Sequence, residues 1–176
     1  GLVLKMVIGN SEKFIKKKDK LIVTKKTKKK FFKLNPEQTN ALKFLEKIDN
    51  KFDVSVLQGT TGSGKTLVYF ERIKKVIENK NQALVLLPEI FLTNDFKTRF
   101  EDFFGFQPAI WHSKITPKQK RIIWKGLISD KIKILVGARS ALLLPFKKLG
   151  IIIVDEEHDA SYKQDEGVIY NARDMA

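Results

Sequence analysis

One glycine-rich segment constrains the fold of this chain more than any other feature of the sequence. Residues 59–66 match the pattern G-x-x-x-x-G-K-[ST], in which glycines let backbone N–H groups turn toward phosphate oxygens. A chance match would carry no particular context, but here an apolar run at 52–57 precedes the loop and a helical pattern at 65–79 follows it. The segment therefore predicts a nucleotide-phosphate site between a strand and a helix. Its expected nucleotide-binding residues are Gly59, Thr60, Thr61, Gly62, Ser63, Gly64, Lys65 and Thr66.

Two acidic residues at the end of a second apolar run extend this chemistry. The run at 151–154 leads directly into Asp155 and Glu156. We expect Lys65 to reach the β- and γ-phosphates, and Thr66 and Asp155 to hold Mg²⁺. Glu156 would orient and deprotonate an attacking water, which favours hydrolysis over transfer to another acceptor. The alternative is that these acids merely cap a neighbouring helix. We predict Lys65, Asp155 and Glu156 as the catalytic residues.

Strand and helix patterns alternate from residue 31 onward. Asn-Pro and Thr-Pro pairs at 35–36 and 116–117 are typical helix starts, because the polar side chain caps and proline needs no N–H partner there. This alternation predicts an α/β fold, with a parallel sheet covered by helices on both faces and ligands beyond the carboxyl ends of the strands. The expected strands are 52–57, 83–87, 109–112, 132–136 and 151–154, and the expected helices start at 36, 65, 94, 117 and 172.

Positive charge is concentrated at the start of the chain. The formal net charge is +14, of which residues 1–30 contribute +9 through eleven lysines against Glu12 and Asp19. The segment 13–30 is therefore either a surface that neutralises nucleic-acid phosphates or a solvated tail that maintains solubility. A short strand-like run lies inside it at 21–24.

Several classes of protein are excluded by composition. Without cysteine the chain cannot form a disulfide scaffold or a cysteine-based zinc site, and with only His112 and His158 it cannot form a multi-histidine metal centre. Its apolar runs are far shorter than the roughly 20 residues of a membrane-spanning helix. Residues 1–10 make a poor signal peptide because they lack a basic leader. We expect a soluble, intracellular protein.

Beyond the phosphate loop, several further strings carry a resemblance to one family. They are LVLLPEIFLT at 84–93, WHS at 111–113, VGARSA at 136–141, DEEHD at 155–159, SYKQ at 161–164 and YNARD at 170–174. On these strings the chain resembles the superfamily 2 helicases, and within these the first motor lobe of the PriA family of primosomal replication-restart helicases. The resemblance covers about residues 34–176, and the stretch that starts at Asp155 is its most specific part.

The resemblance implies a RecA-like P-loop lobe at 34–176, truncated at its C-terminal end, after a basic extension at 1–33 that would be the end of a winged-helix, DNA-binding region. It implies ATP and Mg²⁺ as cofactors, with zinc only in a C-terminal part beyond this chain. The implied activity is an ATP-dependent 3′–5′ DNA helicase that assembles the primosome at stalled forks. The implied partners are fork or single-stranded DNA, other primosome proteins and single-strand binding protein, in the bacterial cytoplasm at the nucleoid.

The family also implies roles for individual residues, each with a structural alternative. Gln38 matches the adenine-reading glutamine, but it could instead close a capping box with Asn35. The residues expected at the DNA backbone could instead make ordinary loop hydrogen bonds, and those of the aromatic-rich loop, which would couple DNA engagement to hydrolysis, could be half-buried packing residues. His158 would contact the nucleotide side or relay state between the sites, or it could make only a hydrogen bond that supports a neighbouring site residue. The candidates for the DNA backbone are Thr93, Arg139 and Ser140, and those for the aromatic-rich loop are Tyr162, Lys163, Tyr170 and Arg173.

Two positions depart from the family pattern: Leu67 stands where relatives have an acid, and Ile169 where they often have a basic residue. The family's arginine finger and second lobe have no counterpart, so we expect this lobe alone to bind ATP weakly and to hydrolyse it slowly or not at all. The alternatives are the motor of another DExH-type translocase, such as a restriction subunit or an RNA helicase, and a non-catalytic module that binds DNA or nucleotide.

Overall fold

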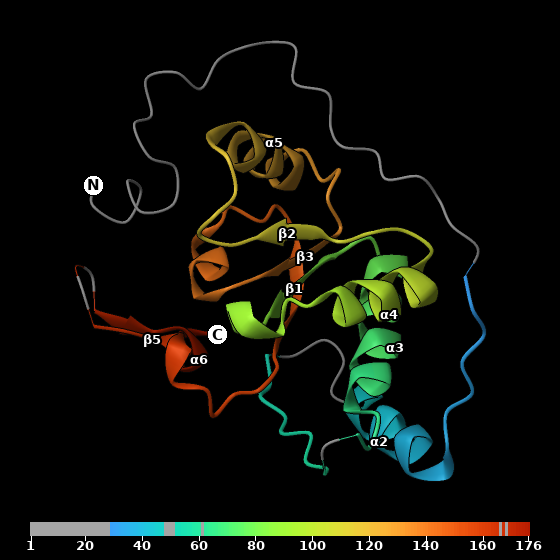
Figure 1. The fold of residues 1–176 in the computed structure, drawn as a ribbon. Helices are drawn as coiled ribbons and strands as arrows, with labels where there is room; N and C mark the ends of the chain where they lie inside the picture. The colour runs from blue at the N-terminus through green and yellow to red at the C-terminus, as the bar shows by residue number, and fades with distance from the viewer. Residues whose placement is uncertain (1–28, 48–51, 61, 166, 168) are drawn as a thin grey trace.

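A four-stranded parallel sheet organises the chain (Figure 1). The computed structural model describes residues 29–47, 52–60, 62–165, 167 and 169–176. The strand order is β2-β3-β1-β4, so the first strand lies in the interior of the sheet. The connections from β1 to β2 and from β3 to β4 each pass over one strand. The sequence-based prediction of a parallel α/β fold is confirmed. The strands are β1 (Gln82–Leu86), β2 (Ala109–Trp111), β3 (Ile134–Gly137) and β4 (Leu149–Val154).

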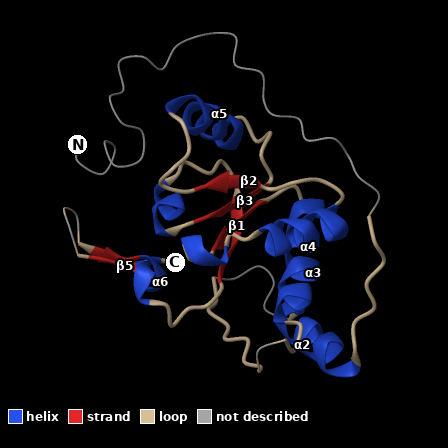
Figure 2. Ribbon diagram, viewed as in Figure 1, coloured by secondary structure: helices blue, strands red, loops and turns tan. Residues whose placement is uncertain are grey.

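Helices lie on both sides of this sheet (Figure 2). The long helices start within a residue of where the sequence predicts them. A small antiparallel hairpin, β5 (Lys163–Gln164) with β6 (Tyr170–Asn171), lies apart from the main sheet. None of the helices that the structure describes is long and apolar enough to cross a membrane. The helices are α2 (Pro36–Glu46), α3 (Lys65–Glu78), α4 (Asn94–Phe104), α5 (Pro117–Ile128) and α6 (Ala172–Met175), with 3₁₀ turns η2 (Glu89–Phe91), η3 (Arg139–Leu143) and η4 (Ala160–Tyr162).

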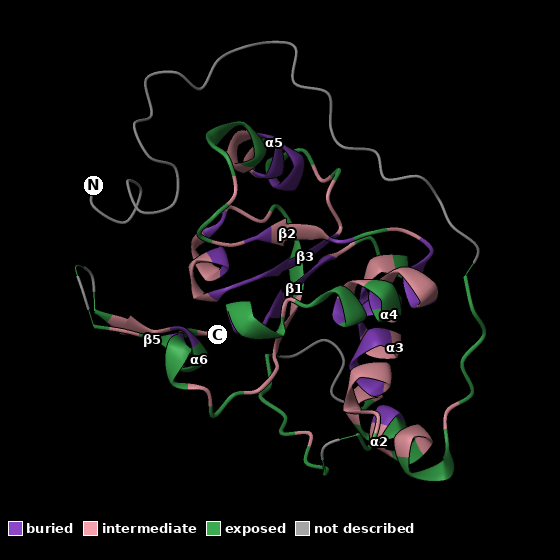
Figure 3. Cartoon of the chain, viewed as in Figure 1, coloured by how far each residue is buried: buried purple, intermediate pink, exposed green. Residues whose placement is uncertain are grey.

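Alternation along β1 divides the core into two layers. Ala83 and Val85 face α3 and α4, where the aromatic rings of both helices gather around Phe70. Leu84 and Leu86 face the opposite side, which α5 and η3 cover. Because side chains alternate between the faces of a strand, an uninterrupted apolar run serves both layers. Figure 3 shows β1 and β3 buried between the helices.

Local capping signals in the sequence are formed as predicted. Asn35 and Gln38 exchange hydrogen bonds as a capping box at the start of α2, and Thr116 and Gln119 do so at the start of α5. Each box satisfies helix N–H groups that have no intrahelical partner. The helix starts therefore follow from the local sequence alone.

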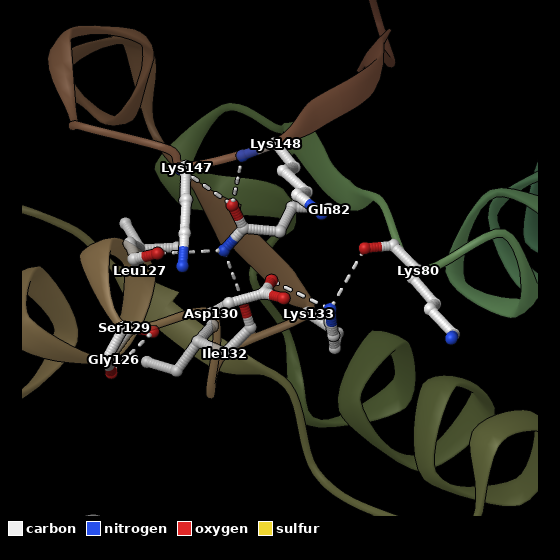
Figure 4. A network of polar contacts seen from close by, with 10 residues as sticks. All are labelled: Lys80, Gln82, Gly126, Leu127, Ser129, Asp130, Ile132, Lys133, Lys147 and Lys148. Carbon is white, nitrogen blue, oxygen red and sulfur yellow. Dashed lines mark hydrogen bonds and ion pairs between the residues drawn. The ribbon is translucent and has the colours of Figure 1, made fainter.

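Gln82, the first residue of β1, is a buried polar centre at the edge where the strands of the sheet begin (Figure 4). Its amide nitrogen donates to the carbonyl oxygens of Leu127 and Ile132, and its amide oxygen accepts from the backbone N–H groups of Lys147 and Lys148. One side chain thus fixes the end of α5, the approach to β3 and the approach to β4.

The predicted strand at 52–57 does not form, and this prediction is wrong. Residues 52–60 have no regular secondary structure, and Phe52, Val54 and Val56 are 88%, 75% and 79% exposed. A strand requires a hydrogen-bonded neighbour, and within the described part of the chain β4 pairs only with β1. The basic segment 13–28, the strand-like run at 21–24 and position 61 lie outside the described residues.

Candidate nucleotide site

The loop before α3 has the backbone conformation that its glycines permit. Gly64 precedes the first helical residue with φ +83°, and Gly62 has φ +82°, both in the left-handed region. A side chain at Gly64 would also collide with the amide of Gln38, since its Cβ would lie 2.3 Å from Nε2. The glycines therefore let the loop turn tightly into the N-terminus of α3, an arrangement that suits an anion.

Lys65 folds back over this loop. Its Nζ donates to the carbonyl oxygens of Gly59 at 2.6 Å and Thr60 at 3.1 Å. The ammonium group is thus held inside the loop by neutral acceptors, which a charged phosphate oxygen could replace with a stronger bond. Thr66, the next residue, is half-buried in the first turn of α3.

Gln38 serves the capping box and also contacts the loop. Its Oε1 accepts from the N–H of Asn35 at 3.0 Å, while its Nε2 donates to the carbonyl of Ser63 at 3.1 Å. The predicted capping box is confirmed, and the adenine contact stays a prediction. An open hollow of about 590 Å³ lies at the start of α2, lined by Lys33, Leu34, Asn35, Pro36, Thr39 and Asn40 and not by Gln38.

Asp155 is fixed through both its backbone and its carboxylate. Its N–H donates to the carbonyl of Leu86 at 3.1 Å, its carbonyl accepts from the Tyr162 hydroxyl, and its Oδ1 accepts from the N–H of Glu156 at 3.1 Å. The Tyr162 hydroxyl lies 3.0 Å from Leu86 O as well, so its one proton is shared between the two carbonyls and joins the carboxyl ends of β1 and β4. The acid therefore projects from a rigid strand end.

Tyr69 joins the phosphate loop to this acid. Its hydroxyl donates to Oδ2 of Asp155 at 2.9 Å. The Thr66 hydroxyl, one turn earlier on α3, acts as a donor to the phenol oxygen and slightly offsets the rise in its pKa. Burial, reinforced by the charge of Asp155, raises the pKa of the Tyr69 phenol well above its ordinary value, so the phenol stays neutral and donates. The loop and the acid consequently meet on one side of the molecule.

Glu156 has an unusual backbone conformation for a residue with a side chain. Its φ of +50° lies in the left-handed region, which costs a non-glycine residue roughly 1–2 kcal/mol. Such strain is often found at functional sites. Its Oε2 lies 3.7 Å from Nε2 of the exposed His158. The base role of Glu156 and the relay role of His158 stay predictions.

The three residues predicted at the DNA backbone all have intramolecular partners. Thr93 caps α4 by accepting from the N–H of Phe96 at 3.2 Å, and the Ser140 hydroxyl accepts from the indole of Trp111 at 3.1 Å. Nη1 of Arg139 donates to the carbonyls of Ser161, at 3.1 Å, and Lys163. Loop hydrogen bonding thus describes their present contacts, and DNA contact stays a prediction.

The aromatic-rich loop divides into buried and exposed members. Tyr162 is only 2% exposed, so its ring offers no open face to a base in this structure, and its role in coupling stays a prediction. Tyr170 is half-buried, and among the described residues its hydroxyl is buried without a hydrogen-bond partner. Lys163 and Arg173 are exposed and pair with Asp165 at 3.0 Å and with Asp174 at 2.9 Å. Of the four residues of this loop, Lys163 and Arg173 are therefore the two that present accessible charge.

The residues at the site suit a magnesium nucleotide. The hydroxyl of Thr66 and the carboxylate of Asp155 are the oxygen donors that Mg²⁺ prefers, and they share a hydrogen-bonded neighbour. The left-handed Gly64 leaves room for backbone N–H groups to approach phosphates closely. Thr66, Asp155 and Gly64 together are the donor set and cradle that such a ligand requires.

Two contacts at this edge escaped the sequence-based analysis. In the sequence Tyr69 is only one position of a helical pattern, because its partner Asp155 lies 86 residues further along the chain. Glu89 accepts from the N–H and the hydroxyl of Ser113 at 2.9 and 3.1 Å, and so joins η2 to the segment after β2. Neither has a local signal, because both depend on how the sheet aligns distant segments.

Comparison with known proteins identifies the family. The family model described as type III restriction enzyme, res subunit, matches residues 31–174. The chain is 48% identical over 143 residues to replication restart protein PriA of Rickettsia felis, a match that covers 81% of this chain and 22% of that protein. It is 43% identical over 181 residues to PriA of Rickettsia typhi, covering 100% of this chain and 26% of that protein. It is 49% identical over 142 residues to PriA of Helicobacter pylori, covering 81% of this chain and 22% of that protein. This chain thus spans about a quarter of their length or less.

A solved structure supports the fold independently. The crystal structure of the DUF1998 helicase MrfA superposes with a TM-score of 0.51 at 22% sequence identity, covering 74% of this chain and 22% of that one. At this identity the likeness establishes the fold alone. The family resemblance inferred from the sequence is confirmed by the matches above: the chain belongs to the type III restriction enzyme res subunit family of superfamily 2 helicase domains, and it is homologous over its whole length to part of replication restart protein PriA.

Proposed function

We propose that this chain is the ATP-binding motor lobe of an ATP-dependent 3′–5′ DNA helicase that acts in replication restart at stalled forks. The homologues in question are named replication restart proteins. The observation that supports the motor role best is the phenol of Tyr69, which connects Thr66 to Asp155. Because these residues come from α3 and from the end of β4, the link joins the two halves that a nucleotide hydrolase needs.

Lys65 and the loop backbone would bind the phosphates. On binding, the Lys65 ammonium would exchange the carbonyls of Gly59 and Thr60 for phosphate oxygens. The N-terminus of α3 favours the same anion through its free N–H groups. The base would then lie toward Gln38, whose amide contacts Ser63 O of the loop.

Glu156 would act on water beside the metal site. Thr66 and Asp155 would hold Mg²⁺, which when bound would neutralise charge on the phosphates. The Glu156 carboxylate, one residue after Asp155, would orient a water and accept its proton. His158, whose ring faces Glu156, would report the state of this carboxylate to the following loop.

The DNA role rests on cations near the hairpin. Lys163 and Arg173 are exposed there, and Arg139 supports the same segment from η3. Neutralising phosphates with such groups releases counterions, so DNA affinity should fall steeply with salt. We infer partners among single-strand binding protein and other primosome proteins in a bacterial cytoplasm, with zinc bound only beyond the C-terminal end of this lobe.

The test is Glu156→Gln in the complete protein that carries this lobe. We expect ATP turnover to fall by about 100-fold or more, since general-base catalysis contributes roughly 10²–10⁴-fold, with ATP binding within about threefold of the unaltered protein. The matched control is Glu157→Gln, because Glu157 is the adjacent exposed acid and faces Arg173. Unchanged turnover in Glu156→Gln would refute the hydrolytic role.

Stimulation by nucleic acid separates the alternatives in the same assay. A DNA helicase should show turnover that single-stranded DNA stimulates more strongly than RNA of the same length. Stronger stimulation by RNA would favour an RNA helicase, and no hydrolysis under any condition would favour a non-catalytic binding module.

A further inference from the structure

Tyr69 has a hydroxyl that packing alone does not require. The side chain is 5% exposed, and its ring packs edge-on against Phe70 with centroids 5.2 Å apart. Phenylalanine would fill this place equally well, without the need to satisfy a buried hydroxyl. A buried hydroxyl is costly unless it is hydrogen-bonded. Here both bonds of the hydroxyl go to Thr66 and Asp155, the two residues suited to a divalent cation.

The position of Tyr69 on α3 explains how one group reaches both partners. Residues three apart lie on the same side of a helix, so Thr66 and Tyr69 face β4 together. The other contacts of Asp155 described above come from the end of β1, from Tyr162 and from the adjacent Glu156. Tyr69 is therefore, among the contacts described, the one that ties the Asp155 carboxylate to the helix carrying the phosphate loop.

We propose that Tyr69 is a positioning residue, which presets the Thr66 hydroxyl and the Asp155 carboxylate at one distance and orientation for a nucleotide-bound divalent cation. This inference rests on the proposed function, because it names the residue that organises the same site. Two oxygen ligands from different elements would otherwise have to be brought together when the metal nucleotide binds, at a cost in affinity. The Tyr69 hydroxyl makes that arrangement part of the folded state.

The test measures nucleotide binding rather than turnover. A fluorescent ATP analogue that is not hydrolysed is titrated into the chain, once with EDTA and once over a series of Mg²⁺ concentrations. For Tyr69→Phe we expect metal-free affinity within about twofold of the unaltered chain. The Mg²⁺ concentration for half-maximal binding should rise by roughly tenfold, because hydrogen bonds to charged groups are among the stronger ones.

The matched control is Ile73→Val, one turn further along α3. Ile73 is fully buried, and the change removes one methylene without touching a hydrogen bond. It should lower stability and leave the Mg²⁺ dependence within about twofold. An equal rise in the half-maximal Mg²⁺ concentration in both variants would mean that destabilisation explains the effect, and would overturn the proposal. An unchanged Mg²⁺ dependence in Tyr69→Phe would also overturn it. If the unaltered chain itself shows no Mg²⁺-dependent binding, the proposed function fails first.

A measurement on the unaltered chain does not depend on how the variant folds. With tyrosine labelled by ¹³C at the ring carbon that bears the hydroxyl, NMR reports hydrogen bonding of each phenol. Adding Mg²⁺ with the same analogue should shift the Tyr69 signal, because Mg²⁺ would withdraw electron density from both of its partners. A Tyr69 signal that stays in place at saturation would overturn the proposal.

Discussion

Replacing Gln82 by leucine would test how the end of α5 and the segments that lead into β3 and β4 are fixed. Leucine has a similar volume, so Gln82→Leu leaves no large cavity and removes only the polar contacts (Figure 4). Gln82 is fully buried, and its four hydrogen bonds measure 2.7–3.1 Å. The backbone groups that they satisfy would lose their partner and face a leucine methyl group instead.

The size of the loss follows from these four groups. Leu127 O also accepts from the N–H of Asp130 and so stays satisfied. The carbonyl of Ile132 and the N–H groups of Lys147 and Lys148 lose the partner that Gln82 provides. A buried group left unpaired costs about 1–3 kcal/mol. Because the neighbouring Lys147 and Lys148 are exposed and water can enter beside them, we take the lower value for each of the three groups. The expected loss is therefore about 3 kcal/mol.

Urea unfolding followed by circular dichroism measures this loss. We expect the midpoint to fall in Gln82→Leu without a change in the dependence of the free energy of unfolding on urea. The control is Gln107→Leu, because Gln107 is exposed and contacts only Glu101 among the bonds described. It should change the free energy of unfolding by less than about 0.5 kcal/mol. A loss below about 1 kcal/mol in Gln82→Leu would show that these loops are not held by this side chain.

Two further predictions concern the phosphate loop and pH. In urea unfolding, Gly64→Ala should destabilise the chain by about 1 kcal/mol more than Gly62→Ala. Both glycines have φ near +80°, so the backbone cost of alanine is the same at the two positions. Only at Gly64 must the new Cβ displace the Gln38 amide and its hydrogen bonds, because nothing lies within 4 Å at Gly62. Equal losses would contradict this steric reading. Burial raises the pKa of each of the three tyrosines in the folded chain. The stability that comes from keeping these phenols protonated is therefore complete below the unfolded pKa of about 10, and it is lost as the pH rises toward the folded pKa values. The free energy of unfolding should fall above pH 10, by up to about 1.4 kcal/mol per pH unit for each tyrosine. Tyrosinate absorbance that appears near pH 10 while the chain is still folded would contradict the raised pKa values.

The sequence predicts those parts of the fold that depend on local signals. The starts of α2 and α5 follow from Asn35 and Thr116, whose side chains cap the N–H groups three residues later. The central strands follow from short apolar runs, because a strand covered on both faces has no polar positions. The phosphate loop and its helix follow from glycine spacing. None of these features requires knowledge of a distant partner.

Features that depend on distant partners could not be predicted. The alternating Phe52, Val54 and Val56 fit a strand pattern, but pairing decides whether a strand forms, and pairing is not written in the segment itself. Tyr162 illustrates the same point for side chains: the sequence leaves stacking and packing open, whereas its contacts with Leu86 O and Asp155 O require burial. Burial of an aromatic side chain is a property of the assembled layers.

The contacts of Arg139 link the two predicted roles of this region. Its Nη1 holds the carbonyls of Ser161 and Lys163, on either side of Tyr162, and Tyr162 holds the carbonyl of Asp155. If a DNA phosphate drew the whole guanidinium away, two carbonyls would lose a charged donor and the support of Tyr162 would weaken. If the phosphate instead met the remaining N–H groups, Arg139 would bind DNA and clamp the segment simultaneously, since its fork carries five donors. In the first case a DNA contact at Arg139 would reach Asp155 through one intervening side chain, Tyr162, and coupling between DNA and nucleotide would need no long pathway.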